Sequence, residues 1–161
     1  MAGLWLVLRV YRRAGFLARF TARDWLLLAP FAAFVIREGT DVVAAINHGR
    51  RLGSAELLHL PVDPLLLVLL GEALLLFRSV RMMGGGWIGK CYAAFSAGIF
   101  LVLLGNAAIW ATAWGYLPWP WSALGWYVWI PAAGAFALGP AYQLEAMQHA
   151  TSGHPRAYPA T

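Results

Sequence analysis

The sequence LLVLLGEALLLF, at residues 66–77, is an apolar run interrupted by a single carboxylate, Glu72. The run continues on both sides over about residues 65–83, which approaches the roughly 20 residues that a helix needs to cross the hydrocarbon core of a bilayer. Asp63 and Pro64 precede it and predict a helix N-cap and a proline at the first helical position. We therefore predict a transmembrane helix that begins at this Asp-Pro pair.

The composition of the whole chain is that of a membrane protein. Of its 161 residues, 61% are hydrophobic and 12% are charged, whereas soluble domains have about 45–50% and about 25%. The single cysteine, Cys91, excludes an internal disulfide and a cysteine-cluster metal site. The formal net charge is +5, but the basic residues flank the apolar runs, so membrane topology explains them and no nucleic-acid partner is expected.

Three further apolar runs have the length of a membrane span. They cover about residues 25–46, 87–114 and 122–147. Asp24 is a candidate N-cap for the first run, whose uncharged part has only twelve residues and also fits a re-entrant helix that would leave three spans. The predicted fold is an all-α integral membrane protein with a bundle of four transmembrane helices at residues 24–147. A polar C-terminal tail at residues 148–161 follows the bundle.

The first 23 residues hold too many arginines to cross a bilayer. On a helical projection of about 100° per residue, five arginines fall within an arc of about 120°, and Leu6, Val7 and Val10 lie outside it. Residues 1–23 therefore predict an N-terminal amphipathic basic helix in the plane of an anionic membrane face. A solvated N-terminal tail is the alternative.

Basic residues are distributed unevenly over the segments between the predicted spans. If the spans alternate in direction, nine basic residues lie on one side, and two, Arg50 and Arg51, lie on the other. Because basic segments stay in the cytoplasm, both termini are predicted to be cytoplasmic in a multi-pass protein of the cell inner membrane. The segments at 47–60 and 115–121 then face outward. The high arginine and alanine content favours a bacterial source.

Three charges interrupt the first predicted span: Arg37, Glu38 and Asp41. Arg37 and Asp41 are four residues apart and can pair within one helix, whereas Glu38 is left over and the mid-span Glu72 has no basic residue within one turn. We predict an intramembrane polar cluster of these four residues, in which Glu72 is either protonated or paired across helices, with Arg37 as its candidate partner. Such a cluster fits proton-linked transport or ligand sensing. Its structural alternative is an ion pair that sets helix register or docks another subunit.

Side chains that bind divalent transition metals occur near the outer end of the first two spans. They are Asp41, His48, Glu56, His59 and Asp63, of which Asp63 is already explained as a helix cap. They match no recognised ligand spacing, and Arg37 would repel a cation, so we expect no metal and keep His48 and His59 as weak candidates. The glycine-rich turn before residue 87 lacks the spacing of a phosphate-binding loop, and there is no nucleophile elbow. We therefore expect a protein that is not an enzyme.

Six of the nine tryptophans fall between residues 110 and 129. An aromatic belt at the outer membrane interface explains tryptophan at this level. The density also fits a docking surface for another protein, a lipid, a quinone or a pigment, although the sequence requires no cofactor. The residues are Trp110, Trp114, Trp119, Trp121, Trp126 and Trp129.

The last two predicted spans carry pairs of small residues at helix-interface spacing. These pairs are Ala94 with Gly98, Ala133 with Ala137, and Ala135 with Gly139. Small residues four apart let two helices approach closely, and Asn106 predicts an interhelical hydrogen bond.

We expect a non-catalytic accessory or scaffolding subunit of a multi-subunit bacterial membrane complex, respiratory or photosynthetic in type. This expectation rests on the tryptophan-rich surface, the small-residue helix faces and the lack of a catalytic motif. Its partners would be other membrane subunits and lipids. The alternative is a small membrane transporter or sensor that uses the intramembrane charges. No motif assigns the chain to a particular family.

Overall fold

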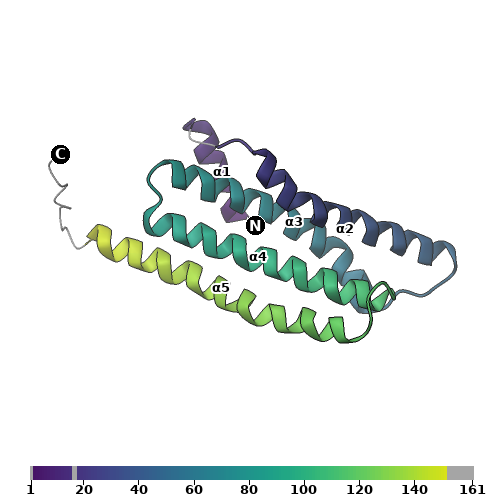
Figure 1. The fold of residues 1–161 in the computed structure, drawn as a ribbon. Coiled ribbons are helices and arrows are strands. Elements are labelled where there is room, and N and C mark those ends of the chain that lie inside the picture. The colour runs from purple at the N-terminus through teal and green to yellow at the C-terminus, as the bar shows by residue number, and fades with distance from the viewer. Residues whose placement is uncertain (1, 16–17, 152–161) are drawn as a thin grey trace.

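The computed structural model describes residues 2–15 and 18–151, and it is all-helical over these ranges. The helices are α1 (Ala2–Arg13), α2 (Ala22–Asn47), α3 (Ser54–Met82), α4 (Gly86–Ala113) and α5 (Pro120–Thr151). Helices α2 to α5 run up and down along one common direction (Figure 1). The α2–α3 and α4–α5 connections lie at one end of this bundle, and the α3–α4 turn lies at the other.

Helix α4 is the centre of the bundle. It packs against α5 on one side and against α3 and α2 on the other, while α1 packs against α3. The buried apolar cluster joins α2, α3 and α4. Its members are Leu28, Phe31, Leu70, Ala73, Ile99 and Leu103. The core therefore sits between three helices, and α5 is held mainly through its contact with α4.

Two helices are long and apolar enough to cross a membrane. They are α3 over His59–Met82, with 24 residues and a mean hydropathy of 2.0, and α4, with 28 residues and a mean hydropathy of 1.8. Helix α2 is continuous over 26 residues although it carries the three charges near its middle. The predicted helical class is thus confirmed, and two of the four predicted spans meet the length and composition of a membrane helix.

Helix α3 begins eleven residues before the predicted start at Leu65, because Ser54 is its first residue. The prediction that Asp63 caps this helix and that Pro64 opens it was wrong. Proline removes one backbone hydrogen bond, but its fixed φ angle is helical, so a helix that is held by its neighbours can continue through it. Asp63 consequently lies within the helix, where its side chain is fully buried.

The N-terminal region is not one helix over residues 1–23. Helix α1 ends at Arg13, and Gly15 has a φ of 74°, a left-handed conformation that glycine adopts without steric cost. The backbone N–H of Ala18 donates a hydrogen bond to Ser79 Oγ at 2.9 Å, so the chain before α2 is bonded to α3. An interfacial position for α1 remains a prediction. The predicted tail at 148–161 is helical to Thr151, and its remainder lies outside the described residues.

The start of α2 is capped by Thr21, with Asp24 three residues further on instead of at the predicted N-cap. One Asp24 carboxylate oxygen accepts hydrogen bonds from Thr21 N at 2.6 Å and Thr21 Oγ1 at 2.8 Å, and it forms an ion pair with Arg78 of α3. Burial by itself would raise the pKa of the Asp24 carboxyl. The Thr21 hydrogen bonds and the Arg78 guanidinium outweigh burial and lower this pKa below its usual value of 3.8.

This ion pair should make the stability of the bundle sensitive to acid. Because the folded-state pKa of Asp24 lies below 3.8, its contribution is fully present above that value and is lost as the pH falls through the folded-state pKa. We expect the stability difference between the native chain and Asp24→Asn to shrink on acidification from about pH 6 to about pH 3. Denaturant unfolding in detergent measures this difference. A difference that is independent of pH would contradict the assignment.

Helices α4 and α5 meet most closely at two glycines. A Cβ atom added to Gly105 would lie 2.5 Å from Trp129 Nε1 and 2.9 Å from the Gly125 carbonyl oxygen. The predicted small residues contribute further along, since added Cβ atoms on Gly98 and Gly139 would press on Phe136 and Phe95. Small residues therefore do bring these helices together, but the tightest crossing is at a pair that the sequence pattern did not single out.

Candidate functional site

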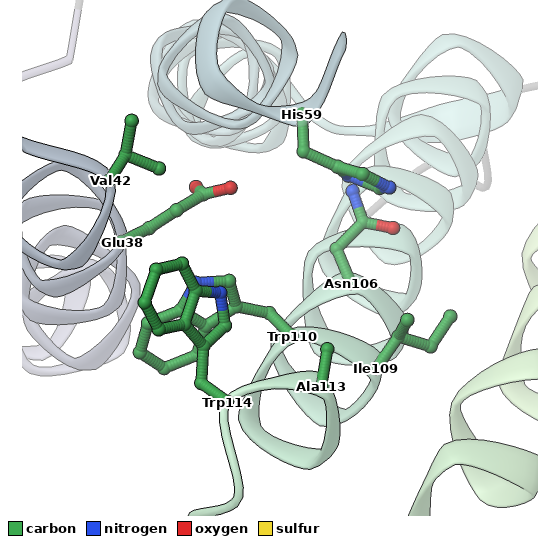
Figure 2. A pocket seen from close by; sticks show the side chains of 8 residues that line it. All are labelled: Glu38, Val42, His59, Asn106, Ile109, Trp110, Ala113 and Trp114. Atoms are coloured by element: carbon green, nitrogen blue, oxygen red, sulfur yellow. The ribbon is translucent and has the colours of Figure 1, made fainter. Parts of the chain in front are cut away.

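A small pocket with mostly apolar walls and three polar side chains lies between α2, α3 and α4, near the end that carries the two longer connections. Figure 2 shows Glu38 of α2 extending across it toward α4, with the rings of Trp110 and Trp114 along one side and His59 of α3 above. The pocket has a volume of about 90 Å³. This is room for a few water molecules, since a cavity needs about 10–15 Å³ to hold one water. A quinone or pigment would need several hundred Å³, so it does not fit.

Glu38, which lines the pocket, meets a second carboxyl group, that of Asp63, which lies behind the pocket wall. The side chains of Glu38 and Asp63 come from different helices and lie within hydrogen-bonding reach of each other. Glu38 is 2% exposed and Asp63 is 0% exposed. Over the described ranges, no arginine or lysine forms an ion pair with either group. Two ionised carboxylates can only accept hydrogen bonds. A hydrogen bond between the two groups therefore requires that one of them carries a proton.

Asn106 of α4 connects the third helix to this pair. Its Nδ2 donates to Asp63 Oδ1, which is the interhelical hydrogen bond predicted for Asn106. His59 Nδ1, one turn before Asp63 on α3, lies 3.6 Å from Asp63 Oδ2. The pocket lining thus contains an amide, an imidazole and one carboxyl group from three helices, and the second carboxyl group, that of Asp63, lies beside all three.

Three polar atoms around the pocket are buried without a hydrogen-bond partner. They are Asp63 Oδ2, Asn106 Oδ1 and Trp110 Nε1. Buried polar atoms in proteins nearly always have a partner, so three orphans at one place require an explanation. A proton on Glu38 would supply a donor to Asp63, and water in the pocket would supply partners for the other two. The arrangement is therefore suited to holding a proton and a small number of waters.

A second polar group lies beside the pocket, toward the end of the bundle. Arg37 and Asp41 form the predicted ion pair within α2, with 3.1 Å between Nη2 and Oδ1. Arg37 also donates to the hydroxyl of Tyr116, which itself donates to Asp41 Oδ2 at 3.1 Å. The Tyr116 ring stacks on Trp110, a wall of the pocket. We call Arg37, Asp41 and Tyr116 the clasp, because it joins α2 to the α4–α5 connection.

Removing the clasp hydroxyl should loosen this connection. We expect Tyr116→Phe to lower the free energy of unfolding by about 1 kcal/mol, the usual net contribution of a hydrogen bond. Tyr127→Phe is the matched control, because Tyr127 is exposed and no hydrogen bond of its hydroxyl occurs in the part of the chain that the structure describes. Equilibrium unfolding in detergent compares the two variants. Equal stabilities would show that the Tyr116 hydroxyl contributes nothing to the clasp.

The candidate pairing of Arg37 with Glu72 does not form. Arg37 is occupied by Asp41 and Tyr116, and its side chain is 57% exposed. Glu72 lies nine residues beyond Asp63 on α3, which places it about 14 Å further along the helix axis. Glu72 is half-buried and makes no hydrogen bond or ion pair with the described residues. The four predicted charges therefore separate into Arg37 with Asp41, Glu38 with Asp63, and Glu72 alone.

The weak metal candidates do not form a site among the described residues. No three histidine, cysteine, aspartate or glutamate side chains in those ranges are placed to hold a metal ion. His48 is the exposed C-cap of α2, and His59 faces Asp63. The side chain of Glu56 lies outside what the structure describes.

The six tryptophans of the predicted docking surface divide into two groups. Trp110, Trp114 and Trp129 are partly buried, and the first two line the pocket. Trp119, Trp121 and Trp126 are exposed, with Trp119 79% exposed. Whether these three bind a partner remains a prediction. The structure gives three of the six another role, in packing and in the pocket wall.

The roles of two residues in the site were not predicted. Asp63 was placed among the outer polar residues but explained as a helix cap, and Tyr116 was treated only as part of an outer segment. The His-x-x-x-Asp spacing from His59 to Asp63 does place both residues on one face of a helix, which was the one available signal. Nothing in the local sequence indicated that Tyr116 reaches α2.

The fold and the pocket define the class of the protein: an all-helical chain with two helices able to cross a membrane and a buried carboxyl pair between three helices. Comparison with protein-family models, with curated proteins and with solved structures gave no match.

Proposed function

We propose that the chain is a multi-pass protein of the inner membrane with α2 to α5 as its four spans and both termini in the cytoplasm. Helices α2 and α5 lie along the same direction as the two apolar helices and have 26 and 32 residues, enough to span a bilayer (Figure 1). Arg78, Arg81 and Lys90 flank the α3–α4 turn, at the end where α2 also begins. The positive-inside rule assigns that end to the cytoplasm.

We further propose that the pocket is the proton-binding element of a small transporter or sensor. The observation that carries this proposal is the contact between the buried side chains of Glu38 and Asp63. Among the described residues, the one basic side chain near this pair is His59, whose Nδ1 lies 3.6 Å from Asp63 Oδ2. Ionised carboxylates are expensive inside a membrane, and two adjacent ones repel each other, so the pair favours a shared proton. Loss of that proton would leave repelling charges on α2 and α3 and drive the helices apart.

This mechanism couples protonation to the spacing of two helices. With one proton, Glu38 donates to Asp63, and Asp63 accepts from Asn106 of α4, so the three helices are joined. Without it, water or a cation must enter the pocket to compensate the charge. The clasp lies at the same end and would control access to the pocket from outside.

The test is proton uptake by the purified protein in detergent. Infrared spectroscopy follows protonation of buried carboxyl groups as the pH is changed, and we expect Glu38→Gln and Asp63→Asn each to remove the titrating signal. Glu72→Gln is the control, because Glu72 is the isolated carboxylate of α3. If the signal persists in both pair variants, or disappears only with Glu72→Gln, the proposed proton site is wrong.

A second candidate function is an accessory subunit of a membrane complex. It is favoured by the exposed tryptophans of the α4–α5 connection and α5, namely Trp119, Trp121 and Trp126. It predicts partner chains in fixed stoichiometry after purification in mild detergent, and their loss when Trp119 and Trp126 are replaced by alanine. A stable chain without partners would argue against this role.

A further inference from the structure

A basic cleft lies between the start of α2 and the end of α3, at the bundle end opposite to the pocket. Its volume is about 720 Å³, much larger than that of the pocket. Arginines of both helices, Arg23, Arg78 and Arg81, line it together with the apolar side chains of Leu74 and Phe77. The cleft therefore has a charged part and an apolar wall.

The positive charge of the cleft is not neutralised from within. Asp24 pairs with Arg78 and compensates that one guanidinium. Arg23 and Arg81 are exposed, and neither forms an ion pair or a hydrogen bond within residues 2–15 and 18–151. Two uncompensated cations at the mouth of one cleft attract an anion.

The order of these side chains along α3 distinguishes between kinds of anion. Leu74 and Phe77 precede Arg78 and Arg81, so the apolar wall lies deeper in the membrane-spanning segment and the charges lie toward its end. An acyl chain can lie along such a wall while the phosphate of the same lipid contacts the arginines. Basic pockets between helices on the cytoplasmic side bind anionic headgroups in this manner.

We propose that this cleft binds an anionic phospholipid, with its phosphate at Arg23 and Arg81 and an acyl chain along Leu74 and Phe77. The bound lipid would join α2 to α3 at the end where the Asp24–Arg78 ion pair is the polar connection between them. This inference rests on the proposed membrane placement but not on the proton site.

The experiment uses the full chain, purified without lipid in an uncharged detergent. Phosphatidylglycerol, phosphatidylcholine and inorganic phosphate are each added, and binding is measured by native mass spectrometry together with the thermal unfolding midpoint. We expect phosphatidylglycerol to bind and to raise the midpoint, with a smaller effect at high salt. We expect Arg23→Gln and Arg81→Gln each to weaken its binding about fivefold, the effect of one basic residue near an anionic lipid surface.

Arg51→Gln is the matched control, because Arg51 is an exposed arginine of the connection at the other end of the bundle. The inference is overturned if phosphatidylcholine binds as well as phosphatidylglycerol, if inorganic phosphate alone produces the same stabilisation, or if Arg51→Gln weakens binding as much as the cleft variants. Each single variant is compared by circular dichroism without lipid to confirm that it is folded. Recovery of the native chain in the soluble fraction without detergent would instead contradict the membrane placement.

Discussion

Replacing Gly105 with alanine is expected to separate α4 from α5 and to destabilise the bundle by about 1–3 kcal/mol or more, the usual range for overpacking. The new methyl group would lie 2.5 Å from Trp129 Nε1 and 2.9 Å from the Gly125 carbonyl oxygen. The backbone oxygen cannot rotate away, and the indole is confined because its ring contacts Trp126 at 4.6 Å between centroids. The helices must therefore move apart along the largest helix–helix contact of the molecule.

Gly134→Ala on α5 is the matched control for this substitution. A Cβ atom added to Gly134 meets nothing within 4 Å, so only the gain in helix propensity of about 1 kcal/mol remains. The two exchanges are chemically identical and should have opposite signs in the thermal unfolding midpoint measured in detergent. If Gly105→Ala is as stable as Gly134→Ala, the close crossing at Gly105 is wrong.

Most of the helical layout could be predicted because it follows from local properties of the sequence. Apolar runs and the glycine turn before residue 87 placed α2, α4 and α5 within a few residues of their ends. The Arg37–Asp41 ion pair is also local, since it depends only on the spacing of two residues within one helix. The start of α3 was predicted wrongly because that prediction was also local. Asp63-Pro64 is a strong local signal for a helix start, but the helix is continuous through these two residues.

The site depends on contacts between residues far apart in the sequence. Asp63 and Asn106 are separated by 43 positions, and Tyr116 and Asp41 by 75. The relative position of α2 and α3 along their axes determines which residue of α3 faces Glu38. The start of α3 was predicted eleven residues too late, so this register could not be predicted. The sequence therefore indicated a buried carboxylate on each of the first two spans, but it selected Glu72 where the structure has Asp63.

The two ends of the bundle differ in the sign of their charged groups and in how these groups are paired. At the basic end, Asp24 and Arg78 neutralise each other, and the remaining arginines surround an open cleft. At the other end, the carboxyl groups of Glu38 and Asp63 meet beside a small pocket, and the nearby cation, Arg37, pairs with Asp41 and Tyr116 instead. An anion would stabilise the first arrangement and a proton the second, so the two sites can be tested independently.

The second large effect is expected from Asn106→Leu. Leucine has nearly the volume of asparagine, but it lacks the N–H group that donates a hydrogen bond to Asp63 Oδ1. An unpaired buried acceptor costs about 1–3 kcal/mol, and more if it is charged. We therefore expect the free energy of unfolding in detergent to fall by at least this range, and the proton uptake of the carboxyl pair to change with it.

Thr112→Val on the same helix serves as the control for this substitution, because its hydroxyl donates only to Ala108 O one turn earlier, at 2.9 Å. The double variant Asp63→Leu with Asn106→Leu removes both partners of the interhelical bond. Replacing both members of a buried pair by apolar groups is close to neutral, so the double variant should be more stable than Asn106→Leu alone. If the two substitutions simply add, Asn106 does not act through Asp63, and the three-helix connection at the pocket is wrong.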